Sequence, residues 1–204
     1  MKKHCPLIFI VTLSGLTLPA IAETFSYTYV SAEYSRFSSA LDGYSEDFEG
    51  NKYSIDVSIR LLRNLAAEAG YSRSSASVNM SGATADADIT STSLGVVAHT
   101  AVNDTTDFII GMNFFNGKAD VDVNGSYIGR IDADGGSAKL GIRKMMFDTL
   151  ELNGYIYKRT IEDTTNIGLD VSAAYYFNKT VSLDLGYSSD DDSEVFALAL
   201  TKYF

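Results

Sequence analysis

Apolar and polar residues alternate with a period of two through most of this chain, and that pattern limits what the chain can fold into. In the clearest segment, 53–61, the apolar positions are Tyr53, Ile55, Val57, Ile59 and Leu61, and the polar positions are Ser54, Asp56, Ser58 and Arg60. Successive side chains of a strand point to opposite faces, so such a segment has one apolar and one polar face. Segments 138–143, 167–177 and 181–187 repeat the pattern. The sequence therefore predicts an all-β fold.

The alternation divides into ten predicted strands. Their approximate ranges are 25–37, 51–61, 64–75, 88–101, 106–123, 126–144, 149–159, 165–177, 180–188 and 194–204. An even number of strands returns both termini to the same end, as in bacterial outer-membrane barrels. We therefore predict a single closed, antiparallel, up-and-down transmembrane β-barrel of about ten strands, with eight strands as the alternative.

The first 22 residues have the composition of an export signal. Lys2 and Lys3 give a positive start, an apolar stretch runs from Leu7 to Leu18, and Ala20-Ile21-Ala22 supplies a small-x-small cleavage site. The apolar stretch is too short for a transmembrane helix. We expect residues 1–22 to be a cleaved signal peptide and residues 23–204 to form the barrel domain.

Composition narrows the class of protein once 1–22 is set aside. Residues 23–204 contain no Cys, Pro or Trp, and their net charge is −12, from 14 Lys and Arg against 26 Asp and Glu. Nucleic acid is excluded as a partner because phosphate binding needs clustered cations. The mean hydropathy of the whole chain is +0.01. This value suits a membrane barrel, because alternation averages apolar and polar residues.

Short and long connections alternate between the predicted strands, so that the short ones lie at one end of the barrel and most of the long ones at the other. With the N-terminus on the periplasmic side, the short turns are 62–63, 102–105, 145–148 and 178–179, and longer loops are expected at 38–50, 76–87 and 189–193. Asn124-Gly125 is the exception on the outer side, because it is a strong two-residue hairpin signal. The alternation of short and long connections favours a membrane barrel over a soluble β-sandwich.

The polar faces carry ionisable residues in the middle of the strands. If the apolar faces contact lipid, these residues fill the lumen, where they must pair and hydrogen-bond. The predicted lumen charge network consists of Glu33, Asp56, Arg60, Glu68, Lys139, Arg143, Glu151, Asp170 and Asp184, with Asp107 beside them. Aromatic residues are expected in two girdles at the strand ends: Tyr34, Tyr53, Tyr71, Phe114 and Tyr187 on the outer side, and Phe108, Tyr175, Phe177 and Phe204 on the inner side.

The opening Tyr29-Val30-Ser31-Ala32-Glu33-Tyr34, the alternating strands and the terminal Phe204 resemble the small outer-membrane β-barrel family related to the transmembrane domain of outer membrane protein A. The resemblance covers about 24–204. It implies a place in the bacterial outer membrane but no particular activity, because family members include structural, adhesive and weakly pore-forming proteins. The last strand also resembles the C-terminal signal read by the outer-membrane assembly machinery, with Phe204 as its key residue and Lys202 as a departure.

Residues that could carry chemistry are few. His99 is the one histidine of 23–204, and its position near the periplasmic end of a strand favours a rim residue, so we expect no enzyme. Asp120-x-Asp122-x-Asn124-Gly125 resembles half of a calcium loop, but Ile131 replaces its closing Glu. No metal site and no cofactor are predicted. The acidic loop ends could bind divalent cations weakly, although a solvated acidic surface is the favoured interpretation.

Two functions remain open, beside a third in which the chain is a secreted soluble ligand-binding barrel. The first is a structural or surface-interaction role in the outer membrane, in contact with lipid and lipopolysaccharide. Basic residues expected near the outer rim could pair with lipopolysaccharide phosphates: Arg36, Lys52, Arg73, Lys118, Lys158 and Arg159. The second is a small channel that prefers cations, because the predicted lumen is acidic. The sequence does not decide the oligomeric state.

Overall fold

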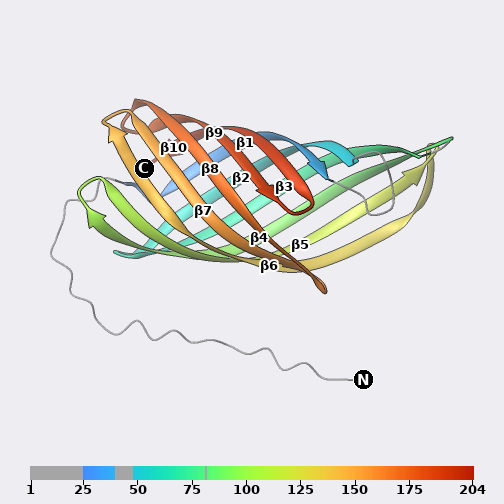
Figure 1. Ribbon diagram of the computed structural model, residues 1–204, viewed down its shortest axis with the longest axis horizontal. Coiled ribbons are helices and arrows are strands. Elements are labelled where there is room, and N and C mark those ends of the chain that lie inside the picture. Colours follow the sequence, from blue (N-terminus) through green and yellow to red (C-terminus); the bar gives the residue numbers. More distant parts are fainter. Residues whose placement is uncertain (1–24, 40–47, 81) are drawn as a thin grey trace, which may run out of the picture.

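The computed structural model describes residues 25–39, 48–80 and 82–204, which form ten strands. The strands are β1 (Tyr29–Ser39), β2 (Phe48–Leu62), β3 (Leu65–Met80), β4 (Ala83–Asn103), β5 (Thr106–Val123), β6 (Ser126–Phe147), β7 (Leu150–Ile161), β8 (Thr164–Asn178), β9 (Val181–Asp190) and β10 (Ser193–Tyr203). Consecutive strands pair antiparallel, and β1 pairs with β10 to close the sheet (Figure 1). The prediction of a ten-stranded closed barrel is confirmed. The predicted signal peptide, 1–22, lies outside the described residues.

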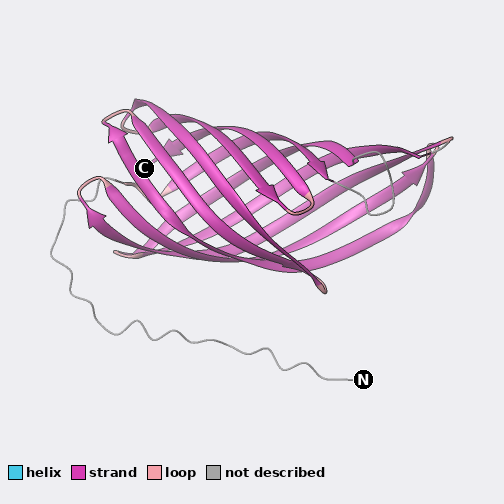
Figure 2. Ribbon diagram, viewed as in Figure 1, coloured by secondary structure: helices cyan, strands magenta, loops and turns pink. Residues whose placement is uncertain are grey.

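Strands account for the regular structure of the described residues (Figure 2). In this part of the chain, no helix is long and apolar enough to cross a membrane. We call the end of the barrel that holds Phe25 and Phe204 the terminal end, and the opposite end the distal end. At the distal end β3, β4, β5 and β6 reach farthest (Figure 1).

Tight turns separate most of the strands. Apart from 40–47, each pair of consecutive strands is separated by two residues. The expectation of long loops at 76–87 and 189–193 is therefore wrong. Residues 76–80 and 83–87 pair with each other as β3 and β4, and β9 and β10 approach to within the two residues Asp191 and Asp192. These stretches were difficult to identify because Ala, Ser and Asp give little contrast between their two faces.

The outer surface of the barrel carries an apolar belt. Its side chains are large and 44% to 68% exposed, with Leu94 and Phe114 at the upper end. The belt includes Ile55, Ile59, Leu94, Val96, Ile110, Met112, Leu140, Ile142, Ile156, Leu169, Leu185, Leu198 and Leu200. Leaving one such side chain in water forgoes roughly 1.5–3 kcal/mol of burial free energy. A continuous belt of them is stable only against lipid, which is the arrangement of a membrane barrel.

Beyond the belt, the same strands reverse their polarity. We call residues 75–80, 83–90, 116–123 and 126–134 the distal extension. Most of its outward positions are polar or charged, Tyr127 being an exception, and they include Asp86, Asp88, Asn116, Lys118, Asp120, Asp132 and Asp134. Its inward positions are apolar, and they include Ala76, Val78, Ala87, Ile89, Ala119 and Val121. The distal extension therefore projects out of the lipid into water.

Glycines on the inward face accommodate large rings from neighbouring strands. A Cβ at Gly141 would collide with Tyr155, and a Cβ at Gly168 would collide with Tyr157. Each of these glycines is the direct cross-strand partner of its aromatic residue. The same relation joins Phe37 to Gly50 and Phe115 to Gly135. A ring lying over a glycine lets large side chains fill the lumen while the sheet keeps its curvature.

Candidate functional site in the barrel lumen

The terminal end of the lumen is closed by the chain that precedes β1. The sequence predicted a strand from residue 25, but β1 begins at Tyr29 and residues 25–28 are not strand. Phe25 and Tyr27 are only 4% and 3% exposed, and they pack in one apolar cluster with residues from three strands: Ala66, Val97 and Ile109. We call this closure the floor of the lumen.

A buried ion pair runs through the floor. Arg143 of β6 donates through Nε and Nη2 to the two carboxylate oxygens of Glu151 on β7, both at 2.9 Å. The two side chains are 8% and 3% exposed. The Tyr176 hydroxyl donates to Glu151 Oε2 at 2.7 Å, and the Arg143 guanidinium lies 4.7 Å and 4.9 Å from the ring centroids of Phe25 and Tyr27. The charges are therefore paired, hydrogen-bonded and covered by rings, which burial of ions requires.

His99 belongs to the same floor. Its ring stacks on Tyr27 with centroids 3.6 Å apart, and its Nδ1 lies 3.5 Å from Asp107 Oδ2. The Tyr27 hydroxyl donates to the same carboxylate oxygen at 2.7 Å. The expectation of a rim histidine is wrong, because His99 is 8% exposed. Its partner Tyr27 lies 72 positions earlier in the chain, so no local pattern could have revealed the contact.

Arg60 also lies at the floor and not along the open part of the lumen. Its Nη2 donates to the backbone carbonyl of Phe25 at 3.2 Å, and its guanidinium lies 5.9 Å from the Tyr27 ring centroid. Arg60 therefore holds the segment 25–28 in place. It is the one member of the predicted charge network that does not line the cavity described next.

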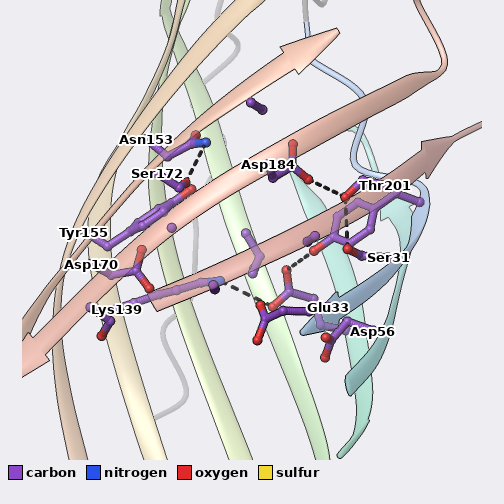
Figure 3. A pocket seen from close by; sticks show the side chains of 18 of the residues that line it. Ser31, Glu33, Asp56, Lys139, Asn153, Tyr155, Asp170, Ser172, Asp184 and Thr201 are labelled. Carbon is purple, nitrogen blue, oxygen red and sulfur yellow. Dashed lines mark hydrogen bonds and ion pairs between the residues drawn. The ribbon is translucent and has the colours of Figure 1, made fainter. Parts of the chain in front are cut away.

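Above the floor lies a cavity of about 540 Å³. Figure 3 shows Lys139, Tyr155 and Asp170 reaching into this space from one wall, and Glu33 and Asp56 from the other. Six carboxylates and four cations line it, so its walls carry an excess of negative charge: Glu33, Asp56, Glu68, Glu151, Asp170 and Asp184 against Lys52, Lys139, Arg143 and Arg159.

Two ion pairs cross between strands in the cavity. Lys52 Nζ lies 3.4 Å from Glu33 Oε1, and Lys139 Nζ lies 3.5 Å from Glu68 Oε2. These side chains are 26% to 37% exposed, so the pairs are partly open to the cavity. Lys139 also lies 5.5 Å from the centroid of the Tyr155 ring.

Hydroxyl groups donate hydrogen bonds to two of the remaining carboxylates, Asp184 and Asp56. Asp184 accepts hydrogen bonds from Ser182 at 2.6 Å and Thr201 at 2.5 Å, and Thr201 in turn bonds to Ser31 (Figure 3). Asp56 accepts one from Ser54 at 3.0 Å. Asp170 lies near Lys139 on the same wall. The structure thus places eight of the nine predicted network residues around one cavity. Four of them form two direct ion pairs, Lys139–Glu68 and Arg143–Glu151.

The predicted position near the outer rim is wrong for two basic residues. Lys52 and Arg159 were expected near the outer rim, but both line the cavity. Arg159 Nη2 donates to Asp190 Oδ2 at 2.5 Å. The alternation of faces along each strand predicts the inward orientation of both residues. Lys52 lies on the same face of β2 as Asp56, and Arg159 lies on the same face of β7 as Tyr155. The other basic rim residues, Arg36, Arg73, Lys118 and Lys158, do point outward.

The half calcium loop forms a β-hairpin. Asn124 and Gly125 have φ values of 51° and 74° and make the two-residue turn between β5 and β6. Asp120 is held by Arg130, whose Nε and Nη2 donate to its two oxygens at 2.8 Å. Across the described ranges, no cluster of three or more His, Cys, Asp or Glu side chains is arranged to hold a metal ion.

Phe204 ends the chain on the outer surface of the terminal end. It is 73% exposed, and its backbone N–H donates to the Thr28 carbonyl at 3.0 Å. Lys202 stays at the same border, where its Nζ donates to Thr180 Oγ1 at 2.8 Å. The residue that follows β10 is thus hydrogen-bonded to the segment that enters β1.

Comparisons with known proteins agree with this architecture. The translocator domain of the autotransporter NalP from Neisseria meningitidis is 12% identical, with a TM-score of 0.58 over 90% of this chain and 91% of that chain. The transport unit of the autotransporter AIDA-I from Escherichia coli is 13% identical, with a TM-score of 0.53 over 93% and 94%. Neisserial surface protein A is 14% identical, with a TM-score of 0.51 over 88% and 98%. These likenesses establish the fold alone. No curated protein matches the chain significantly.

The family assignment rests on the sequence profile. The profile of the outer membrane protein beta-barrel domain matches residues 8–188, which is most of the chain. It agrees with the closed barrel, the apolar belt and the inward-facing charges. The chain belongs to the outer membrane protein beta-barrel domain family, and its location is the bacterial outer membrane.

Proposed function

We propose that this protein is a non-conducting outer-membrane barrel with a structural or surface-interaction role. The observation that carries the proposal is the floor. A pore must remain open from end to end, whereas the Arg143–Glu151 pair, Phe25 and Tyr27 fill the terminal end with side chains that are at most 8% exposed. Opening that end would separate a buried ion pair, which is strongly unfavourable.

The proposed orientation places the terminal end at the periplasm and the distal extension outside the cell. The reversed polarity of the extension supports this, because its charged outward face suits water rather than lipid. Outward cations follow the belt directly on the distal side, since Arg36 lies two residues beyond Tyr34, Arg73 two beyond Tyr71, and Lys158 two beyond Ile156. Such a ring matches the level of lipopolysaccharide phosphates, which we propose as its partners.

We also propose that the barrel performs no catalysis. His99, the histidine available for acid–base chemistry, is buried in the floor between Tyr27 and Asp107. A catalytic base must reach a proton of its substrate within hydrogen-bond distance. A side chain sealed under Tyr27 does not offer that access.

The exposed Phe204 supports an assembly role for the C-terminus, because an aromatic ring at the end of β10 is available to another protein before the barrel closes. Deleting Phe204 should lower the amount of barrel recovered from outer membranes. Unchanged recovery would contradict this role.

The alternative is a small channel that prefers cations, and the acidic cavity favours it. Planar-bilayer recording separates the two. We expect the intact protein to give no steady current. Replacing Phe25 and Tyr27 with serine should open a leak that prefers cations, because carboxylates outnumber cations in the cavity. A steady current from the intact barrel would contradict the non-conducting role and support the channel. A soluble ligand-binding barrel is set aside by the family assignment and the apolar belt.

A further inference from the structure

We propose that the free edge of β6 binds an extended segment of an extracellular protein, one that alternates basic and apolar side chains, and adds it as a strand to the distal extension. The proposal rests on the surface-interaction role and the outward orientation proposed above. It names the chemistry of the partner.

The distal part of β6 has a sheet neighbour on one side only. Its ladder with β5 runs to Ser126, but its ladder with β7 stops at Gly135, paired with Ile161. Figure 1 shows β6 continuing beyond the hairpin of β7 and β8 as the border of the sheet. Within the described residues, segment 126–133 therefore has an open edge, and such an edge is a template for another strand.

The backbone groups that point to this edge follow from the alternation along β6. The Glu162 N–H donates to the Asp134 carbonyl at 3.1 Å, so the backbone groups of residue 134 face the β7 side. Asp132 and Arg130 direct their N–H and C=O groups to the same side, where no strand lies. The bulge of the ladder with β5 lies beyond Gly129, toward the tip, and does not disturb these two residues. An added strand can therefore bond to the N–H and the C=O of both.

The space for an added strand is closed at one end. Residues 160–162 of β7 and its turn already lie beside residues 134–136 of β6. An added strand continues the line of β7, and it must end or leave the sheet at the turn formed by Glu162 and Asp163. It therefore pairs with residues 126–133 and displaces no existing strand.

Inward side chains of the added strand meet an apolar pocket. Ile131 and Ala133 line this pocket of about 420 Å³ together with Ile161 of β7. Ile131, Ile128 and Tyr127 are 60%, 66% and 62% exposed, although they lie in the extension beyond the lipid belt. Exposed apolar groups outside the membrane indicate a protein partner. Since directly opposite residues share a face of the sheet, apolar residues of the partner beside Ile131 and Ala133 would fill the pocket.

Outward side chains of the added strand meet carboxylates. Asp132 points outward at the edge, and Glu162 and Asp163 lie at the closed end of the space. In the described part of the chain, none of the three forms an ion pair. Arg130 is already held in its ion pair on β5, which leaves Lys118, opposite Asp132, as the adjacent cation. This excess of negative charge favours a partner whose outward residues are basic.

The test uses the full-length barrel in phosphatidylcholine vesicles and a fluorescent synthetic peptide of alternating lysine and valine. The peptide should bind barrel vesicles and not empty vesicles, as measured by fluorescence anisotropy. A peptide of the same composition, with its lysines and valines in two separate blocks, should bind at least about tenfold more weakly. The block peptide cannot place lysine outward and valine inward along one strand.

Backbone methylation of the peptide tests whether it binds as a strand. In an antiparallel pair, the peptide residues opposite Arg130 and Asp132 are lysines, and their N–H groups point to β6. Methylating the lysine backbone nitrogens should abolish binding. Methylating the valine backbone nitrogens should preserve it, because those groups point away from β6. Equal effects of the two modifications would overturn the proposal.

Two variants of the barrel remove the charge and the backbone donor at the edge. Asp132→Lys should weaken binding of the alternating peptide at least about tenfold, because it places like charges opposite each other. Asp86→Lys makes the same change on the outward face of β4, away from the edge, and should leave the affinity unchanged at physiological salt. Asp132→Pro deletes an N–H that points to open space, so the barrel should keep its heat-modifiable migration while binding is lost.

Three further outcomes would overturn the proposal: no binding of the alternating peptide, equal binding of the block peptide, or equal losses in Asp132→Lys and Asp86→Lys. Clustering of barrel vesicles without peptide would assign the edge to a second copy of the chain and would also overturn it. An electrically silent barrel that does not bind the peptide would leave the non-conducting role intact, so the two proposals fail separately.

Discussion

The distal extension continues four of the strands that carry the belt, β3 to β6, yet the two regions bury opposite faces. In β4, Leu94 and Val96 point outward in the belt, while Asp86 and Asp88 occupy the same outward positions in the extension. On the inward side, Ser91 and Ser93 give way to Ala87 and Ile89. The backbone geometry does not change between the two regions. The period of a strand therefore sets its two faces, whereas the medium around the sheet decides which face is apolar.

The largest effect should come from breaking equivalent ion pairs in the two regions. Glu151→Ala leaves Arg143 buried with no counter-ion, and the free energy of unfolding should fall by about 3–5 kcal/mol. Asp120→Ala removes the same bidentate geometry from Arg130, but that pair is 53% and 39% exposed. It should leave the unfolding midpoint unchanged, because water solvates the released arginine. Urea unfolding in lipid vesicles measures both. Equal losses would remove the distinction between the regions.

A second comparison places the same charge on the outward face of each region. Met112→Arg puts a cation in the belt on β5 and should cost about 2–4 kcal/mol of unfolding free energy. Asn116→Arg lies four residues farther along the same face, beside Asp134, with which Asn116 is hydrogen-bonded. It should cost at most about 1 kcal/mol, because the lipid ends before it. If the two variants unfold at the same urea concentration, the belt does not end at Phe114.

The smallest effect should separate the inner and outer faces of the wall. Gly141→Ala introduces a Cβ against Tyr155 and should cost about 1–3 kcal/mol through overpacking. Gly154→Ala on the neighbouring strand meets no atom within 4 Å and should be neutral or slightly stabilising. Tyr155→Ala should relieve the Gly141→Ala penalty only in part in a double-mutant cycle, because a Cβ at Gly141 would also collide with the backbone carbonyl oxygen of Gly154. An additive cycle would mean that the ring does not impose the glycine.

The sequence predicts most accurately which face of a strand each residue occupies. It identified ten strands and the inward facing of Glu33, Asp56, Glu68 and Asp170, because both follow from a strict alternation that each strand carries within itself. The same alternation also predicts that Lys52 and Arg159 point into the lumen. It failed at 76–87, where small polar residues make the two faces alike and composition suggested a loop.

The alternation of Cβ positions along an extended backbone is local, so the sequence by itself determined the strands, their faces and the barrel class. Tertiary structure alone decided how the lumen closes and where the edge of β6 is left open. Tyr27 meets Asp107 across 80 positions of the chain, and β6 outruns β7 because the two strands differ in length. Such contacts depend on strand stagger and on side chains that meet across the ring, and no residue's own neighbours encode either.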